Sequence, residues 1–406
     1  MERYGQYRDR GKCHSDHVLI LTSSRDGTNT TQGSGIAPFL PIAPPPTSPL
    51  WLPWHLLLFS IRVPLVAFAW FIWLTLISHI PAGSGLRKAN QWCLLGIPGV
   101  WWVDLQIDGV RRGSVGRFGG SRRALPQPGT VVSASWTSPL DVLYLAAIFD
   151  PIFTLSHAGE EGSKKGVRVV SQETALAASV GVQNPLELLS GPRDIVPLSD
   201  LLAKNPKRII VVFPEGTTSN GRGILRLVPS SLTSAAPHTK IYPMSIKYTP
   251  QDIVTPIPGW TEVLRFIWRL NSSQNHTIRV RIGAPHTKSM HTKAVDGDST
   301  SQTTARGGQE RPTSSRSGRG GGFESNFFDT LQRSPPRHEE ADDPMEGRGD
   351  TRAEVSPAEQ KLLDAVADDL ARLGRVKRVD LGVEEKERFI QAWNGAKGAR
   401  ERSGRR

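Results

Sequence analysis

The stretch Arg208-Ile-Ile-Val-Val-Phe-Pro-Glu-Gly-Thr-Thr-Ser-Asn-Gly-Arg222 decides the fold. Its apolar run, residues 209–213, is rich in β-branched side chains and predicts a buried strand. Pro214 ends this strand, because proline cannot donate a hydrogen bond to a neighbouring strand. A carboxylate, a glycine and three hydroxyl side chains follow in the turn 215–219. Such a turn is typical of a binding site at the edge of an α/β sheet, although an ordinary polar turn has the same composition.

A second informative stretch, residues 129–145, begins with a predicted strand over 130–134. Ser138 is suited to cap a helix that begins at Pro139, and Asp141 then lies in its first turn, where the helix dipole favours a carboxylate. Other strands and helices are predicted by periodicity and capping signals. The strands are expected over 100–107, 149–155, 167–170, 241–248 and 276–282, and the helices over 173–180, 199–204, 260–270 and 357–373. Strands that alternate with helices predict an α/β fold.

Residues 50–80 are the most apolar part of the chain. The segment 63–80 contains no Lys, Arg, Asp or Glu and approaches the roughly 20 residues that a bilayer span needs. Arg62 and Pro64 interrupt the longer run, so a tilted span and a re-entrant hairpin both fit, and a buried core helix is a third interpretation. Because Arg87 and Lys88 follow closely, the positive-inside rule predicts that the downstream domain faces the cytosol.

The distribution of charge favours an anionic partner. The chain has 406 residues, a formal net charge of +12 and a mean hydropathy of −0.31. Residues 51–285 hold 23 Lys and Arg against 13 Asp and Glu, so the basic excess belongs to the folded part. A phosphate substrate or lipid head groups are the expected partners, since no nucleic-acid motif is present. The two cysteines, Cys13 and Cys93, are too few for a disulfide framework or a metal cluster.

The order of these features resembles that of a known family. An apolar segment precedes two strands with polar turns, and a third strand, Ile241-Tyr-Pro243, has an early proline. This arrangement resembles the phospholipid/glycerol acyltransferase family, most closely the fungal lysophosphatidic acid acyltransferases that use oleoyl-CoA. The supporting stretches are GSGIAPFLP (33–41), IPGVWWVDLQIDG (97–109), TSPLDVLYLAAIFDPIFT (137–154), RIIVVFPEGTTSNGRGIL (208–225) and LGVEEKERFIQAW (381–393).

The resemblance implies a glycerolipid acyltransferase-like mixed sheet with flanking helices, preceded by a membrane helix or hairpin. It implies transfer of an acyl group from acyl-CoA, as cosubstrate, to lysophosphatidic acid, with no bound cofactor and no metal. The implied location is the endoplasmic reticulum membrane or the lipid droplet, with membrane lipids as partners. The implied catalytic residues are Asp141 and Ser138, and the implied lysophospholipid-binding residues are Phe213, Pro214, Glu215, Gly216, Thr217, Ser219 and Arg222.

Composition and resemblance together predict six segments. They are a disordered N-terminus (1–48), a membrane segment (49–88), an acyltransferase-like domain (89–285), a disordered linker (286–352), a C-terminal helical region (353–395) and a basic tail (396–406).

Two positions depart from the family pattern. Trp136 stands where the family has a histidine as general base, and an indole nitrogen cannot accept a proton near neutral pH. Thr218 stands where many relatives carry a phosphate-binding arginine, and Arg222 is the predicted substitute for that charge. His157 is the nearest histidine after the motif, but a loop histidine is more often a surface residue. The alternative prediction is therefore a pseudoenzyme that binds lipid or acyl-CoA without catalysis.

Overall fold

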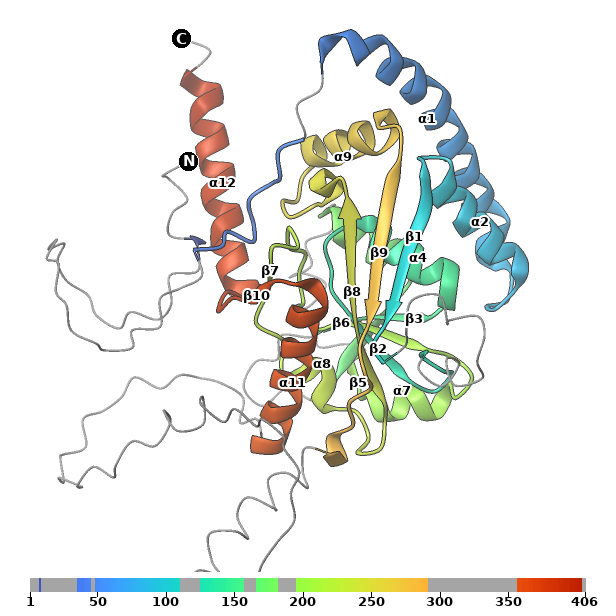
Figure 1. Cartoon of the computed structure of the whole chain (residues 1–406), viewed down its shortest axis with the longest axis vertical. Coiled ribbons are helices and arrows are strands. Elements are labelled where there is room, and N and C mark those ends of the chain that lie inside the picture. The colour runs from blue at the N-terminus through green and yellow to red at the C-terminus, as the bar shows by residue number, and fades with distance from the viewer. Residues whose placement is uncertain are drawn as a thin grey trace, which may run out of the picture. The chain divides into compact units, whose positions relative to one another are not determined.

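The computed structural model describes residues 7–8, 35–44, 48–109, 125–156, 166–181, 195–290 and 356–403. Its central element is an eight-stranded sheet with the order β1-β9-β8-β2-β6-β3-β4-β5 (Figure 1). These strands are β1 (Val100–Ile107), β2 (Val131–Ala134), β3 (Ile152–Ser156), β4 (Val167–Val170), β5 (Ile195–Val196), β6 (Ile210–Phe213), β8 (Ile241–Thr249) and β9 (His276–Ile282). The four neighbouring strands β8, β2, β6 and β3 are parallel to one another. Strand β4 pairs with β3 in antiparallel fashion, and β9 pairs with β8 in the same way. The predicted α/β fold with a mixed sheet is confirmed.

Strand β6 lies inside the parallel group, between β2 and β3. All its residues are buried, and successive side chains point to opposite faces of the sheet. Val211 and Phe213 belong to the core on one face, and Ile210 and Val212 to the core on the other. A strand that is covered on both faces needs apolar residues at every position, which explains the continuous apolar run.

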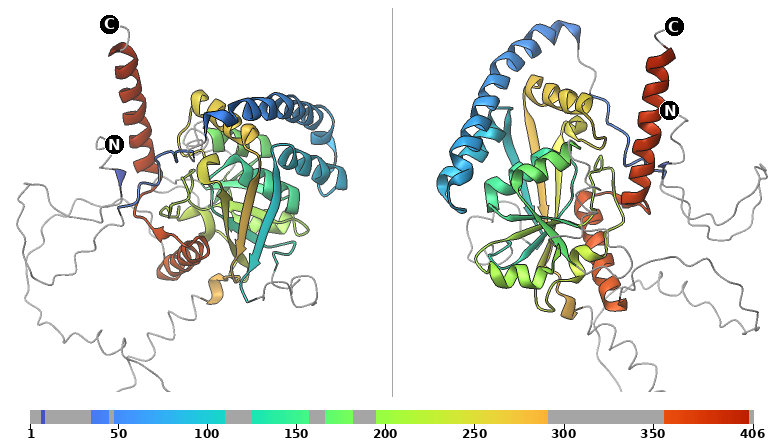
Figure 2. Two further views of the ribbon diagram at one scale, coloured as in Figure 1. Left: turned by 45° about the horizontal axis from the view of Figure 1, so that its top comes forward. Right: turned by 180° about the vertical axis from the view of Figure 1, so that it is seen from behind.

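Helices cover both faces of the sheet (Figures 1 and 2). One core contains residues of α2 (Gly85–Gly96), α4 (Pro139–Phe149), α5 (Gln172–Val180) and α9 (Trp260–Ser272). The opposite core contains residues of α7 (Leu198–Lys204), α8 (Ser230–Thr233) and α11 (Pro357–Gly374). Helix α11, predicted over 357–373, begins with a capping box formed by Ser356 and Glu359.

The apolar segment forms one helix, α1 (Leu52–Thr75), within a helical stretch Pro49–His79 that is long and apolar enough to cross a membrane. Only 11% of its most apolar window is buried. Contacts near both ends nevertheless attach α1 to the rest of the fold. His55 Nδ1 lies 2.8 Å from the carbonyl oxygen of Ser272 at the end of α9, and Trp73 Nε1 donates to Glu173 on α5 at 2.7 Å. Pro64 lies inside the helix and does not divide it.

Residues 35–44 differ from the expectation of a disordered N-terminus. Phe39 is buried, and its ring lies 5.8 Å from that of Phe389. The side-chain amide of Asn220 donates to the carbonyls of Ala37 and Leu40 at 2.8 Å each. The segment therefore packs beside the turn that follows β6. Its anchoring depends on a few contacts with distant residues, which the local composition does not encode.

The C-terminal region also packs on this turn. After α11, β10 (Lys377–Arg378) pairs in parallel with β7 (Gly223–Ile224), and α12 (Val383–Ser403) follows. Residues 286–290, which the prediction assigned to the linker, contact α11, since His286 Nε2 lies 2.8 Å from Asp369 Oδ2. The other residues of the predicted linker, 291–352, lie outside the described residues.

Candidate active site

The two informative stretches meet at one edge of the sheet. Strand β2 runs parallel to β6, with Ser133 opposite Val212, so the segments that follow the two strands lie side by side. The amide of Ser219 donates to the carbonyl of Trp136 at 3.0 Å and joins the two turns directly. The fold thus places residues 135–141 beside residues 214–219.

Asp141 holds the first turn of α4 together. Its Oδ2 accepts hydrogen bonds from the amides of Thr137 and Ser138, at 2.7 and 2.9 Å, and from the Thr137 hydroxyl at 3.2 Å. Its Oδ1 accepts from the hydroxyl of Tyr248. The carboxyl group is fully buried, and burial raises its pKa to about 6 against the opposing effect of these hydrogen bonds. Both carboxylate oxygens are therefore engaged within the protein.

Ser138 is the N-cap residue of α4, as predicted. Its hydroxyl accepts from the amide of Leu140 at 3.4 Å and donates to the carbonyl of Ile253 at 2.8 Å. The capping box that Ser138 forms with Asp141 fixes the path of the chain from β2 into α4.

Trp136 fills the position at which a histidine was expected. The side chain is fully buried, and its ring stacks on Phe213 at 4.7 Å with an angle of 20° between the planes. Its Nε1 has no hydrogen-bond partner among the described residues. Trp136 and Phe213 both belong to the core that contains α4, so the aromatic pair serves to pack this face of the sheet.

Glu215 is fully buried at the start of the turn after β6. The amide of Leu225 donates to its Oε2 at 3.2 Å, whereas Oε1 has no hydrogen-bond partner within the described part of the chain. Burial raises the pKa of Glu215 to about 8. Hydrogen bonding to the amides of Leu225 and Trp136 opposes this rise, as does the positive charge of Lys386 to a smaller extent. The negative charge of Asp141 adds to the rise. A buried carboxyl oxygen without a partner is costly, which makes Glu215 a candidate ligand-binding residue.

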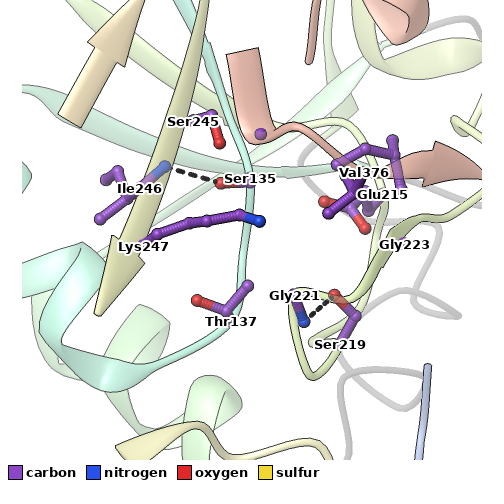
Figure 3. Close-up of a pocket in the computed structure, with 12 residues that line it drawn as sticks. Ser135, Thr137, Glu215, Ser219, Gly221, Gly223, Ser245, Ile246, Lys247 and Val376 are labelled. Atoms are coloured by element: carbon purple, nitrogen blue, oxygen red, sulfur yellow. Dashed lines mark hydrogen bonds between the residues drawn. The ribbon is translucent and has the colours of Figure 1, made fainter. Parts of the chain in front are cut away.

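Glu215 borders a small pocket, called the cavity below, that opens at this edge of the sheet (Figure 3). Strand β2 and its extension, the turn after β6, strand β8 and the end of α11 all contribute to the wall. The polar side chains in the wall are Ser135, Thr137, Glu215, Ser219, Ser245 and Lys247. Trp136, Ser138 and Asp141 are not among the lining residues. Since β2 side chains alternate, Ser135 and Thr137 face the cavity while Trp136 faces the opposite core.

Gly216 explains the tight path of the turn beside Glu215. Its φ of +67° is in the left-handed region, which favours glycine. A Cβ atom there would lie 2.8 Å from Cγ2 of Val228 and 3.1 Å from Cγ2 of Val383. The turn is thus enclosed on one side by the start of α12.

Helix α12 contributes a residue that the sequence did not single out. Lys386 is buried, and its Nζ donates to the carbonyl oxygen and the hydroxyl of Thr218 at 2.6 and 2.8 Å. Burial lowers the pKa of Lys386 to about 7, and Glu215 opposes this shift. A cation therefore contacts Thr218, at the position where an arginine was expected. Lys386 belongs to the stretch 381–393, which supported the family resemblance. A single lysine on a helix, however, gives no indication of the residue that it contacts.

The other predicted binding residues have different environments. Phe213 packs in the core, Thr217 is buried, and Ser219 lines the cavity. Arg222 is exposed and does not line the cavity. His157 lies outside the described residues. Among the residues that the structure does describe, no group of three or more His, Cys, Asp or Glu side chains is placed to hold a metal ion.

Fold and site define an α/β protein with a buried carboxyl group beside a pocket at the carboxyl ends of parallel strands. Comparison with known proteins adds one similarity. The chain is 26% identical, over 261 residues, to a protein of Schizosaccharomyces pombe named "Putative lysophosphatidic acid:oleoyl-CoA acyltransferase". The alignment covers 62% of this chain and 81% of that protein, and confirms the resemblance predicted from the motifs. No family model and no solved structure matches the chain.

Proposed function

We propose that this protein transfers an acyl group from acyl-CoA to lysophosphatidic acid and so produces phosphatidic acid. The observation that carries the proposal is Glu215, a fully buried carboxyl group whose Oε1 has no partner and which lines the cavity between β2, β6 and β8. The similarity to the Schizosaccharomyces pombe protein supports acyl transfer and this pair of substrates.

In the proposed reaction, the free glycerol hydroxyl of the acceptor attacks the thioester carbon of acyl-CoA. A carbon–oxygen bond forms, the carbon–sulfur bond breaks, and the thiolate of CoA leaves and takes up a proton. The hydroxyl proton passes to the carboxylate of Glu215, which acts as general base. Trp136 cannot accept it, and both oxygens of Asp141 are engaged. A base with a pKa of about 8 is suited to this task near neutral pH.

Asp141 and Ser138 act in this proposal as positioning residues. They fix the backbone of residues 136–138, which in turn carries Thr137 into the wall of the cavity. The predicted catalytic role of these two residues stays a prediction.

We further propose that the protein works at a membrane surface, with α1 lying in the interface. The helix exposes a row of large apolar side chains: Leu56, Leu57, Ile61, Leu65, Phe68, Phe71 and Leu74. His55 and Trp73 are bonded to the domain and are separated by about 27 Å at 1.5 Å per residue. Since a span needs about 30 Å of helix surrounded by lipid, the two contacts favour a position in the interface over a span. The endoplasmic reticulum or lipid droplet, with the domain in the cytosol, is the proposed location.

The test is acyl transfer by the full chain in membranes, with oleoyl-CoA and lysophosphatidic acid. We expect activity in the wild type that rises with pH through about 8 and levels off above it, since the carboxylate of Glu215 forms above its pKa. Glu215→Gln removes the base and is expected to lower kcat by about 100-fold or more. Glu384→Gln, an exposed carboxyl on α12, is the control and should keep full activity.

The second candidate function is a pseudoenzyme that binds a lysophospholipid or acyl-CoA. Trp136 in the position of the base and Thr218 in the position of the arginine favour it. A wild type that binds lysophosphatidic acid but transfers no acyl group would support the pseudoenzyme and refute the enzyme. Activity that is equal in the wild type and Glu215→Gln would reject the role of Glu215.

A further inference from the structure

Lys247 is a second ionisable residue in the wall of the cavity. It lies on β8, directly opposite Arg279 of β9, and is half-buried. Figure 3 shows its side chain extending from the strand into the cavity, between Ser135 and Thr137. Lysine ammonium groups are common on open protein surfaces, where water satisfies them, but are uncommon inside a concave site. An ammonium group at the position of Lys247 is therefore expected to have an anionic partner.

The described part of the protein offers Lys247 no anionic partner. The two charged groups that act on it are cations, Arg279 and Arg281, and together with burial they lower its pKa. Arg279 is paired with Asp104 at 3.3 Å, and Arg281 donates to the carbonyl of Leu373 at 2.7 Å. An ammonium group near two other cations is destabilised until an anion binds.

The end of α11 does not serve as this partner either. Helix C-termini attract cations through their free carbonyl groups. Here the amide of Arg375 occupies the carbonyl of Arg372, and the amide of Val376 occupies that of Ala371. The carbonyl of Leu373 is taken by Arg281, as above. The Lys247 ammonium makes no hydrogen bond or ion pair with the residues that the structure describes, and its side chain lines the cavity.

Two hydroxyl groups of the cavity wall can add donors for an anion. Ser135 Oγ accepts from the amide of Ile246 at 3.1 Å, and Ser219 Oγ accepts from the amide of Gly221 at 3.3 Å. Each hydroxyl keeps its own proton, so each can donate to a ligand oxygen. One ammonium and two hydroxyl donors match the oxygens of a phosphate group.

We propose that Lys247, with Ser135 and Ser219, binds the phosphate group of the acyl acceptor. The substrate class is then a glycerol phosphate monoester, with its phosphate at Lys247 and its free hydroxyl at Oε1 of Glu215. This inference rests on the proposed acyl transfer and assigns the phosphate to a strand residue outside the predicted motifs.

The test compares acceptors with and without a phosphate. Wild type, Lys247→Met and Lys247→Arg are assayed in membranes with oleoyl-CoA and either lysophosphatidic acid or monoacylglycerol. We expect Lys247→Met to raise KM for lysophosphatidic acid by about 10- to 100-fold, the effect of one charge-assisted contact, with kcat changed less. Its kcat/KM for monoacylglycerol should stay within about twofold of the wild type. Lys247→Arg keeps the charge and should restore most of the affinity.

The control is Lys240→Met, an exposed lysine that precedes the same strand. An equal loss with both acceptors, or no loss in Lys247→Met, overturns the inference while the acyl transfer itself stands. Binding of glycerol 3-phosphate by the detergent-solubilised full chain is measured in parallel. If the wild type binds it and Lys247→Met does not, the phosphate site is supported even where no acyl transfer occurs. If the wild type does not bind it, the site is rejected. Circular dichroism verifies folding, and Lys247→Gln, which also removes the charge, serves where the methionine variant fails to fold.

Discussion

At the scale of single residues, Asp141 illustrates how a motif residue can act through the backbone. Asp141→Ala removes the acceptor for two amides and two hydroxyl groups that are all buried. We expect a loss of about 2–4 kcal/mol in stability, from the lost helix cap and the unpaired donors, and a loss of activity with it. Asp141→Asn keeps an oxygen toward the cap, and its NH2 group can donate to the Tyr248 oxygen. This variant should stay within about 1 kcal/mol of the wild type and remain active.

Thermal unfolding and acyl transfer of the two variants separate positioning from catalysis. If Asp141 took part in proton transfer, the asparagine variant would be as inactive as the alanine variant. The pH dependence gives an independent check. The pKa of Asp141 is raised from 3.8 to about 6 in the folded state, so its contribution to stability falls as pH rises between these values. In Asp141→Asn this part of the decline between pH 4 and 6 should be absent.

The sequence predicted the residues around the site better than their roles. Glu215 was placed correctly after a buried strand, because the proline and the apolar run are local signals. The sequence did not show that the side chains of Trp136 and Thr137 point to opposite sides of the sheet. Both residues follow the end of β2, and the turn there has no hydrophobic periodicity from which the direction of a side chain could be predicted. The role of Lys247 depends on the cavity, and cavities form from segments far apart in the sequence.

At the scale of elements, α1 is both a packed helix and a candidate membrane surface. Leu65, Phe68 and Phe71 are exposed by 49%, 62% and 62%, so glutamate at these positions should not disturb the core. The triple variant is expected to lose binding to vesicles of phosphatidylcholine and phosphatidic acid, because three apolar side chains each contribute about 1.5–3 kcal/mol when buried in lipid. Sedimentation with vesicles measures this loss, and Val169→Glu, exposed on β4, is the control.

Extraction by alkaline carbonate distinguishes a helix in the interface from a span. We expect the wild-type protein to be released from membranes, since α1 is held against the domain at His55 and Trp73. Retention in the membrane pellet, together with cleavage of the two flanks of α1 by proteases on opposite sides, would show that α1 crosses the bilayer. The sequence left span and hairpin open because hydropathy measures how apolar a segment is and not what it contacts.

At the scale of the whole molecule, the site depends on both ends of the chain. The segment 35–44 bonds to Asn220, and the start of α12 closes over Gly216 and Thr218. A capping signal predicted α11, but nothing local in the sequence shows that α12 returns to a turn 168 residues earlier. Burial dominates the pKa of Glu215, and this long-range pairing adds a smaller effect, since Lys386 is one of the groups that oppose the rise.

The contact between α12 and the turn leads to a prediction about pH. Lys386→Met keeps the length of the side chain but removes its charge, which favours the carboxylate of Glu215. The pKa of Glu215 should then rise slightly further above about 8, because Lys386 has the smallest of the effects on it and, with its own pKa lowered to about 7, carries only part of its charge where Glu215 titrates. Since the carboxylate is the active form, the pH–activity profile of the variant should move to higher pH, with the largest loss of activity near pH 7 and partial recovery above pH 8. Arg388→Met, an exposed cation on the same helix, should leave the profile in place. A uniform loss at every pH would assign Lys386 a structural role at Thr218 alone, and a shift to lower pH would contradict Glu215 as the base.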